Sequence, residues 1–160
     1  WTSDLDVTEK ARAGSELLRA ADAGDAGRVV AALDTLAAEG DVDVDAAAQN
    51  YVTPLMLAAR NGHEAIGKFL AVHGADVNAQ THKGETALMM AAENGHEAIA
   101  KFLAVQGAHL NVQTDDGATA LILAAQNGQS WTRTIKFPCL GINLGDFLTF
   151  ENPKIHRKRK

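Results

Sequence analysis

A period of 33 residues runs through the middle of this 160-residue chain. The segment NYVTPLMLAARNGHEAIGKFLAVHGADVNAQ, which begins at Asn50, returns with few changes from Lys83 and in part from Asp116. A period of this length is the signature of a repeat protein, in which each unit buries its apolar face only against its neighbours. The residues that keep the spacing are Thr53, Thr86 and Thr119; Gly62, Gly95 and Gly128; Gly74 and Gly107; and Asn78 and Asn111.

Each unit is predicted to form two short helices and a turn. Thr53 is a good N-cap, and Pro54 follows at the first helical position, where its missing N–H costs nothing. Gly62 ends this helix, because glycine readily adopts the left-handed conformation common at helix ends. A second helix begins at His63 and ends before Gly74. Neither helix is long enough to be stable alone in water, so we expect neighbouring units to stack.

The unit TPLMLAARNGHEAIGKFLAVHGADVNAQ resembles the ankyrin repeat, whose pattern has T-P-L-H-x-A in the first helix, G-H at the bend and G-A-D-V-N-A in the turn. The resemblance implies an all-α solenoid of stacked helix-turn-helix units with hairpin-like turns, followed by an irregular C-terminal tail. The expected parts are an N-terminal extension, the repeat domain and a divergent basic tail, residues 1–12, 13–129 and 130–160. The domain itself comprises a capping repeat, two complete repeats and a partial one, residues 13–47, 48–80, 81–113 and 114–129.

The capping repeat departs from the period. Residues 17–24, LLRAADAG, have the pattern of a first helix. Gly40 follows Gly24 by 16 positions, whereas Gly74 follows Gly62 by 12. Four extra residues add about one helical turn, so we expect a longer second helix whose buried face stays in phase.

Two further departures concern the family pattern within the repeats. The histidine of T-P-L-H becomes Met56, Met89 and Ile122, so a usual hydrogen-bonding group is expected to be lost. We expect the methionine pair in the core between repeats, and a soft apolar stripe facing a partner is the alternative. Tyr51 replaces the turn glycine found at Gly84. An altered first hairpin, with the tyrosine exposed on it, is predicted.

The ankyrin resemblance implies binding to another protein rather than catalysis. In this family the partner usually meets the hairpin tips and the exposed side of the first helices. Tyr51 and Arg60 are the strongest candidates, since tyrosine and arginine dominate interaction hot spots, and most other candidates are expected to be solvated only. By position, the partner-binding candidates are Asn50, Tyr51, Val52, Arg60, Asn61, His82, Lys83, Glu85, Glu93, Asn94, Asp115, Asp116, Gln126 and Asn127.

The sequence lacks the motifs that mark common catalytic sites. It has no G-x-x-x-x-G-K-[ST] phosphate loop, no G-x-G-x-x-G and no G-x-S-x-G nucleophile elbow. It also has no H-E-x-x-H and no cysteine and histidine at metal-ligand spacing. Together with the resemblance, these absences predict a protein that is not an enzyme and needs no metal or cofactor.

One modification site follows from the resemblance. Leu70 lies eight residues before Asn78, and Asp76 and Val77 directly precede the asparagine. This resembles the sequence that asparaginyl hydroxylases accept in ankyrin repeats. The structural alternative is that Asn78 holds the turn through hydrogen bonds from its side chain to the backbone.

Charge divides the chain where the repeat stops. Residues 1–129 carry 18 acidic and 8 basic residues, whereas residues 130–160 carry 2 and 7, within a net charge of −5. The acidic stack predicts a partner with basic character and disfavours nucleic acid, whose phosphates it would repel. The basic run at the end of the chain resembles a nuclear-localisation signal and comprises Arg157, Lys158, Arg159 and Lys160.

The tail replaces the second helix expected after Gly128. We expect Trp131, Ile135 and Phe137 to pack on the apolar end of the stack, with disorder beyond about residue 150. A substitute ending and the start of a second domain are the alternatives. The lone Cys139, the lack of a secretory-type leader and the lack of an apolar run of about 18 residues favour a cytoplasmic protein without a membrane span. The basic run adds the nucleus as a second expected location.

The sequence therefore predicts a monomeric protein-interaction module that acts as a non-catalytic scaffold or adaptor. One alternative is a regulatory or targeting ankyrin fragment of a larger enzyme, ubiquitin ligase or channel. Another is an engineered ankyrin binder, which the near identity of the two complete repeats favours.

Overall fold

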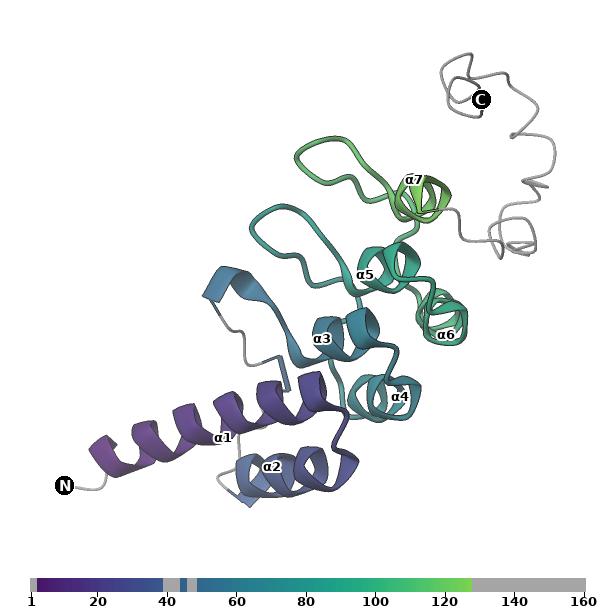
Figure 1. The fold of residues 1–160 in the computed structure, drawn as a ribbon. Coiled ribbons are helices and arrows are strands. Elements are labelled where there is room, and N and C mark those ends of the chain that lie inside the picture. Colours follow the sequence, from purple (N-terminus) through teal and green to yellow (C-terminus); the bar gives the residue numbers. More distant parts are fainter. Residues whose placement is uncertain (1–2, 39–43, 46–48, 128–160) are drawn as a thin grey trace, which may run out of the picture. The chain divides into compact units, whose positions relative to one another are not determined.

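A computed structural model of the chain describes residues 3–38, 44–45 and 49–127 (Figure 1). In these ranges the structure is helical and contains no strand, so the predicted all-α repeat fold is confirmed. The expectations for Trp131, Ile135, Phe137 and the basic run 157–160 lie outside the described residues. The described elements are α1 (Ser3–Ala23), α2 (Ala26–Ala38), the 3₁₀ turn η1 (Gln49–Tyr51), α3 (Pro54–Asn61), α4 (Glu64–Val72), α5 (Ala87–Glu93), α6 (Glu97–Val105) and α7 (Ala120–Gln126).

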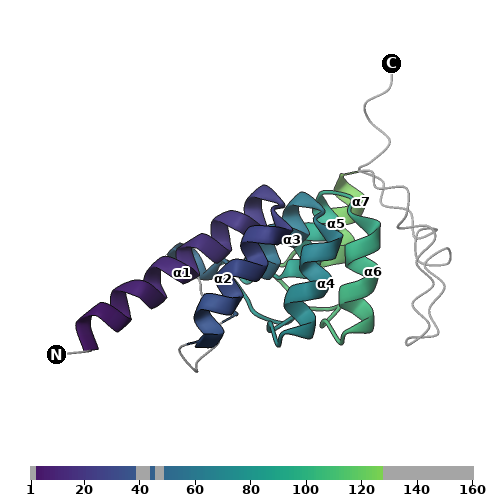
Figure 2. The same ribbon diagram turned by 90° about the horizontal axis from the view of Figure 1, so that it is seen from below.

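The helices of the repeat domain form two rows. The first helices of the units, α1, α3, α5 and α7, lie side by side, and α2, α4 and α6 form the second row beneath them (Figures 1 and 2). Loops between the units project from the first row on the side away from α4 and α6 (Figure 1). We call these loops the first, second and third fingers, residues 49–53, 80–86 and 113–119.

The first helices begin as their sequences predict. The hydroxyl oxygens of Thr53, Thr86 and Thr119 each accept a hydrogen bond from the backbone N–H three residues later, at 3.3, 3.3 and 3.4 Å. Pro54 is the first residue of α3, and Gly62 follows the last residue with a left-handed φ of 76°. The same local rules therefore set the register of each unit.

Small side chains let the first helices pack closely. Ala20, Ala58, Ala91 and Ala124 occupy equivalent places on α1, α3, α5 and α7, and all four are fully buried. Alanine at a helix contact permits a short distance between the helix axes. No helix in the described ranges is long and apolar enough to cross a membrane.

The methionine pair belongs to the core, as predicted. Met56 and Met89 are both buried, so the alternative of an exposed apolar stripe is wrong. The expected loss of a hydrogen-bonding group does not occur at Met56, because the backbone N–H of Thr53 donates to its Sδ at 3.5 Å. A thioether is only a weak acceptor, but the sulfur lies where it can accept a hydrogen bond from this N–H.

The capping repeat is longer than the others in both helices. α2 has 13 residues and α4 has 9, so the four extra residues lengthen the second helix, as predicted. α1 has 21 residues, and its N-terminal part extends beyond α2 in both views (Figures 1 and 2). The predicted boundary between the 1–12 extension and the cap therefore falls inside one continuous helix.

Candidate functional site

The candidate residues lie at the two ends of the first helices, in the fingers that precede them and at their C-terminal ends. All are exposed except Val52 and Glu85, which are half-buried. The finger set comprises Asn50, Tyr51, Val52, His82, Lys83, Glu85, Asp115 and Asp116. The helix-end set comprises Arg60, Asn61, Glu93, Asn94, Gln126 and Asn127.

Backbone hydrogen bonds join the three fingers into one surface. The N–H of His82 donates to the carbonyl oxygen of Asn50 at 3.2 Å, and the N–H of Asp115 donates to that of Lys83 at 3.0 Å. Within the second finger, the N–H of Thr81 donates to the carbonyl oxygen of Glu85 at 3.0 Å, and the third finger repeats this bond. The spacing between the finger tips is therefore fixed by the backbone.

Tyr51 gives the first finger a different tip. Its φ of 59° is left-handed, like the 75° of Gly84 at the same position of the second finger. Asn50 is also left-handed, with a φ of 70°, whereas its counterparts Lys83 and Asp116 are not. The predicted change in hairpin shape is confirmed. A side chain in this backbone region costs about 1–2 kcal/mol relative to glycine.

The Tyr51 ring is exposed but held in place. The tyrosine is 59% exposed, which confirms its predicted position. Its ring meets that of His82 edge to face, with the centroids 4.4 Å apart and the planes at 82°. Such aromatic contacts contribute about 0.5–1.5 kcal/mol beyond the area they bury. The Tyr51–His82 pair therefore forms a fixed aromatic contact point across two fingers.

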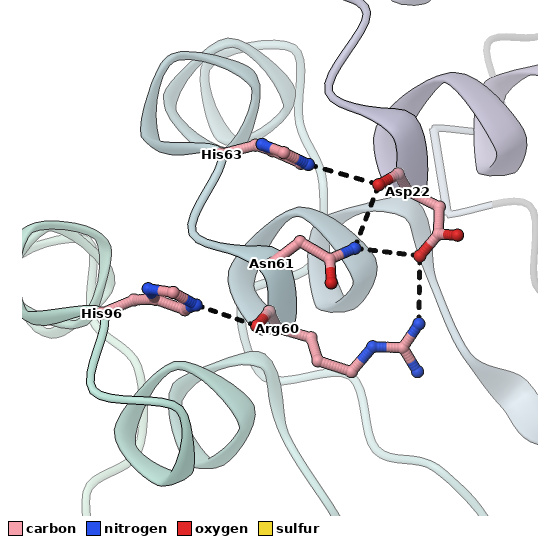
Figure 3. Close-up of polar contacts among 5 residues, drawn as sticks. All are labelled: Asp22, Arg60, Asn61, His63 and His96. Carbon is pink, nitrogen blue, oxygen red and sulfur yellow. Dashed lines mark hydrogen bonds and ion pairs between the residues drawn. The ribbon is translucent and has the colours of Figure 1, made fainter.

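The helix-end residues Arg60 and Asn61 are tied to the capping repeat (Figure 3). The Arg60 guanidinium lies 3.0 Å from Asp22 Oδ1, and both side chains are about half exposed. Asn61 Nδ2 donates to the same carboxylate oxygen at 2.9 Å and to the Asp22 carbonyl oxygen at 3.0 Å. Arg60 is thus already engaged within the molecule, which makes it a weaker candidate for a partner contact than Tyr51.

Asp22 was not among the predicted site residues, although the sequence carries a signal for it. Asp22 precedes Gly24 by two positions, as Arg60 precedes Gly62. The two residues therefore end neighbouring helices of the same row and carry opposite charges.

His63 and His96 join consecutive units. Each Nε2 lies close to a carbonyl oxygen of the preceding unit, at 3.2 Å from Asp22 and 3.0 Å from Arg60 (Figure 3). Because a carbonyl oxygen only accepts, Nε2 carries the proton in each contact. The helix-end glycine of the preceding unit provides the space, since a Cβ at Gly62 would lie 2.5 Å from His96 Nδ1. Through these bonds the two histidines link each unit to the one before it.

Asn78 uses both polar atoms of its amide in the folded turn. Its Nδ2 donates to the Gly107 carbonyl oxygen at 3.3 Å, and its Oδ1 accepts from the His109 N–H at 2.7 Å. The Asp45 carboxylate occupies the equivalent place one period earlier and accepts from the Asp76 N–H. These bonds match the structural alternative given for Asn78, and hydroxylation of this residue stays a prediction.

The remaining candidates differ in whether their side chains have partners. The amides of Asn94 and Asn127 donate to carbonyl oxygens one turn earlier in their own helices, at 2.8 and 3.2 Å. By contrast, the charged groups of Lys83, Asp115 and Asp116 make no hydrogen bond or ion pair with any residue that the structure describes. In the same part of the chain, no three histidine, cysteine or acidic side chains gather in a way that would hold a metal ion.

A family model described as ankyrin repeats, in three copies, matches residues 17–114 and 68–137. A comparison with curated proteins gave no match.

Proposed function

Because the chain belongs to the ankyrin repeat family, we propose that it is a non-catalytic scaffold or adaptor that recognises a protein partner through its fingers. Ankyrin repeats generally act as protein–protein interaction modules, and the family is typically non-catalytic. The finger surface suits this use, since its tips are exposed, their spacing is fixed, and several of their charged groups have no partner among the described residues.

The observation that carries the proposal is the strained, exposed position of Tyr51. A bulky residue occupies a left-handed position where the next two units have glycine. Its ring is mostly exposed, so burial in a core does not offset the backbone strain. Strained residues cluster at functional sites, and tyrosine is among the residues that dominate interaction hot spots. Contact with a partner gives this side chain a role beyond its contact with His82.

The experiment is affinity capture from a cell lysate with the immobilised full chain, followed by mass spectrometry. We expect a defined set of proteins on the wild-type chain and a loss of at least ten-fold on the Tyr51→Ala, His82→Ala double variant, since hot-spot truncations cost about 2 kcal/mol or more. The matched control is Val72→Ala, Val105→Ala. These valines are 78% and 83% exposed but lie on the second-helix row.

The far-ultraviolet circular dichroism of both variants checks that the helices are intact. The proposal fails if the valine variant loses the captured proteins and the Tyr51 and His82 variant keeps them. It also fails if no protein is retained above the level of an unrelated immobilised protein.

A further inference from the structure

We propose that the fingers bind an extended segment of the partner that sets an apolar side chain against the Tyr51–His82 pair and a basic side chain against Asp115 and Asp116. This inference rests on the proposed function and adds the chemistry and the spacing of the segment that is recognised.

The apolar contact belongs at the first finger. Among the large hydrophobic side chains that are exposed in the described ranges, Tyr51 alone lies on a finger. The edge-to-face contact with His82 fixes the tyrosine ring before binding, so little side-chain freedom is lost when a partner covers it. An aliphatic or aromatic side chain that packs on the ring gains burial on a surface that is already ordered.

The basic contact belongs at the third finger. Asp115 and Asp116 occupy the positions that His82 and Lys83 occupy on the second finger, and both are exposed. At these two positions the charge therefore changes from positive on the second finger, at Lys83, to negative on the third. A lysine or arginine of the partner is attracted by the third finger and repelled by Lys83 on the second. Such a pattern selects a basic side chain and also sets which finger that side chain meets.

The geometry favours an extended segment over a helix. A docked helix needs an apolar groove for a stripe of side chains several turns long, and the finger tips offer one apolar contact. Backbone bonds hold the fingers at the spacing of the packed first helices, which is about 8–10 Å per step. From Tyr51 on the first finger to the third finger is two steps, or about 16–20 Å. An extended chain advances about 3.3 Å per residue, so about five or six residues of the partner separate the apolar contact from the basic one.

The test uses the full chain labelled with ¹⁵N and titrated with synthetic peptides, which are followed by NMR. Each peptide is a short glycine–serine chain with one leucine and one pair of arginines, placed about two, six or ten residues apart. We expect the spacing of about six to bind most tightly. We also expect the largest shifts at the amides of Tyr51, His82, Asp115 and Asp116.

Charge variants separate a specific contact from general attraction to an acidic protein. Asp115→Asn, Asp116→Asn is expected to weaken binding of the best peptide about five-fold, as for two exposed ion pairs. The control, Asp34→Asn, Glu64→Gln, removes the same charge from α2 and α4 and is expected to leave the affinity unchanged. Both residues lie on the second-helix row.

Three results overturn the inference: equal affinity at all three spacings, equal weakening by both double variants, or no shifts on the fingers at millimolar peptide. None of these three results contradicts the proposed function, which depends on whether the Tyr51 and His82 variant loses captured proteins. A loss in that capture experiment together with a negative titration would mean that the fingers bind a partner of different chemistry.

Discussion

Replacing Gly62 by alanine tests how much the contact of His96 with the preceding unit stabilises the stack. Gly62 has a φ of 76°, and a Cβ there would lie 2.5 Å from His96 Nδ1 and 2.6 Å from Cε1. The alanine therefore costs about 1 kcal/mol for its left-handed backbone. It also displaces the imidazole, and the lost bond from Nε2 to the Arg60 carbonyl oxygen costs about 1 kcal/mol more. With some lost packing, we expect Gly62→Ala to lower the free energy of unfolding by about 2–3 kcal/mol in total.

Gly74→Ala is the matched control. This glycine has a φ of 94°, and a Cβ there would meet nothing within 4 Å. It carries the backbone penalty alone, so we expect a loss of about 1 kcal/mol. The effect of glycine on the unfolded chain is common to both variants and leaves the difference between them unchanged.

The assay is urea unfolding of the full chain, followed by far-ultraviolet circular dichroism, for both variants and in a His96→Ala background. Without the imidazole, Gly62→Ala should cost no more than Gly74→Ala, which gives a coupling energy of about 1–2 kcal/mol. Equal costs for the two alanine variants, or strict additivity of Gly62→Ala and His96→Ala, would refute the reasoning.

Three further substitutions have definite expected results in the same unfolding assay. Asn78→Ala removes an acceptor for the His109 N–H and a donor to the next turn, so a loss of about 1–3 kcal/mol is expected, and Asn78→Asp should lose less because it keeps the acceptor. Thr86→Ala removes the N-cap bond to the Met89 N–H and should cost about 1 kcal/mol, whereas an unchanged midpoint would show that the cap contributes nothing. Leu70→Ala empties a fully buried site and should cost about 2–5 kcal/mol, a prediction that a loss below 1 kcal/mol would contradict.

The fold was predictable because its rules act over a few residues and repeat. Thr53 and Pro54 start α3, and Gly62 ends it, through cap and backbone preferences that need no knowledge of the rest of the molecule. The burial of Met56 and Met89 follows from the same periodicity. The structure of one unit therefore predicts that of the next.

The contacts between units were harder to predict, because they join residues far apart in the chain. Asp22 reaches Arg60 and Asn61 across 38 and 39 positions, which departs from the period of 33. The binding surface was predicted as a list of positions by resemblance. What the sequence did not show is that Arg60 is engaged within the molecule while Asp115 and Asp116 have no partner among the described residues.

The contacts between units also give the stack a direction. In most contacts at the fingers, the turns and the bends, the later unit supplies the N–H group and the earlier unit supplies the oxygen, as at His82, Asp76 and His63. The bond from Asn78 Nδ2 to the Gly107 carbonyl oxygen runs the other way. Unpaired N–H groups are rarer and less tolerated in proteins than carbonyl oxygens with spare capacity. Each unit thus depends on its predecessor more than on its successor. A chain made from its N-terminus onward has most of these acceptors in place before the donors that need them emerge.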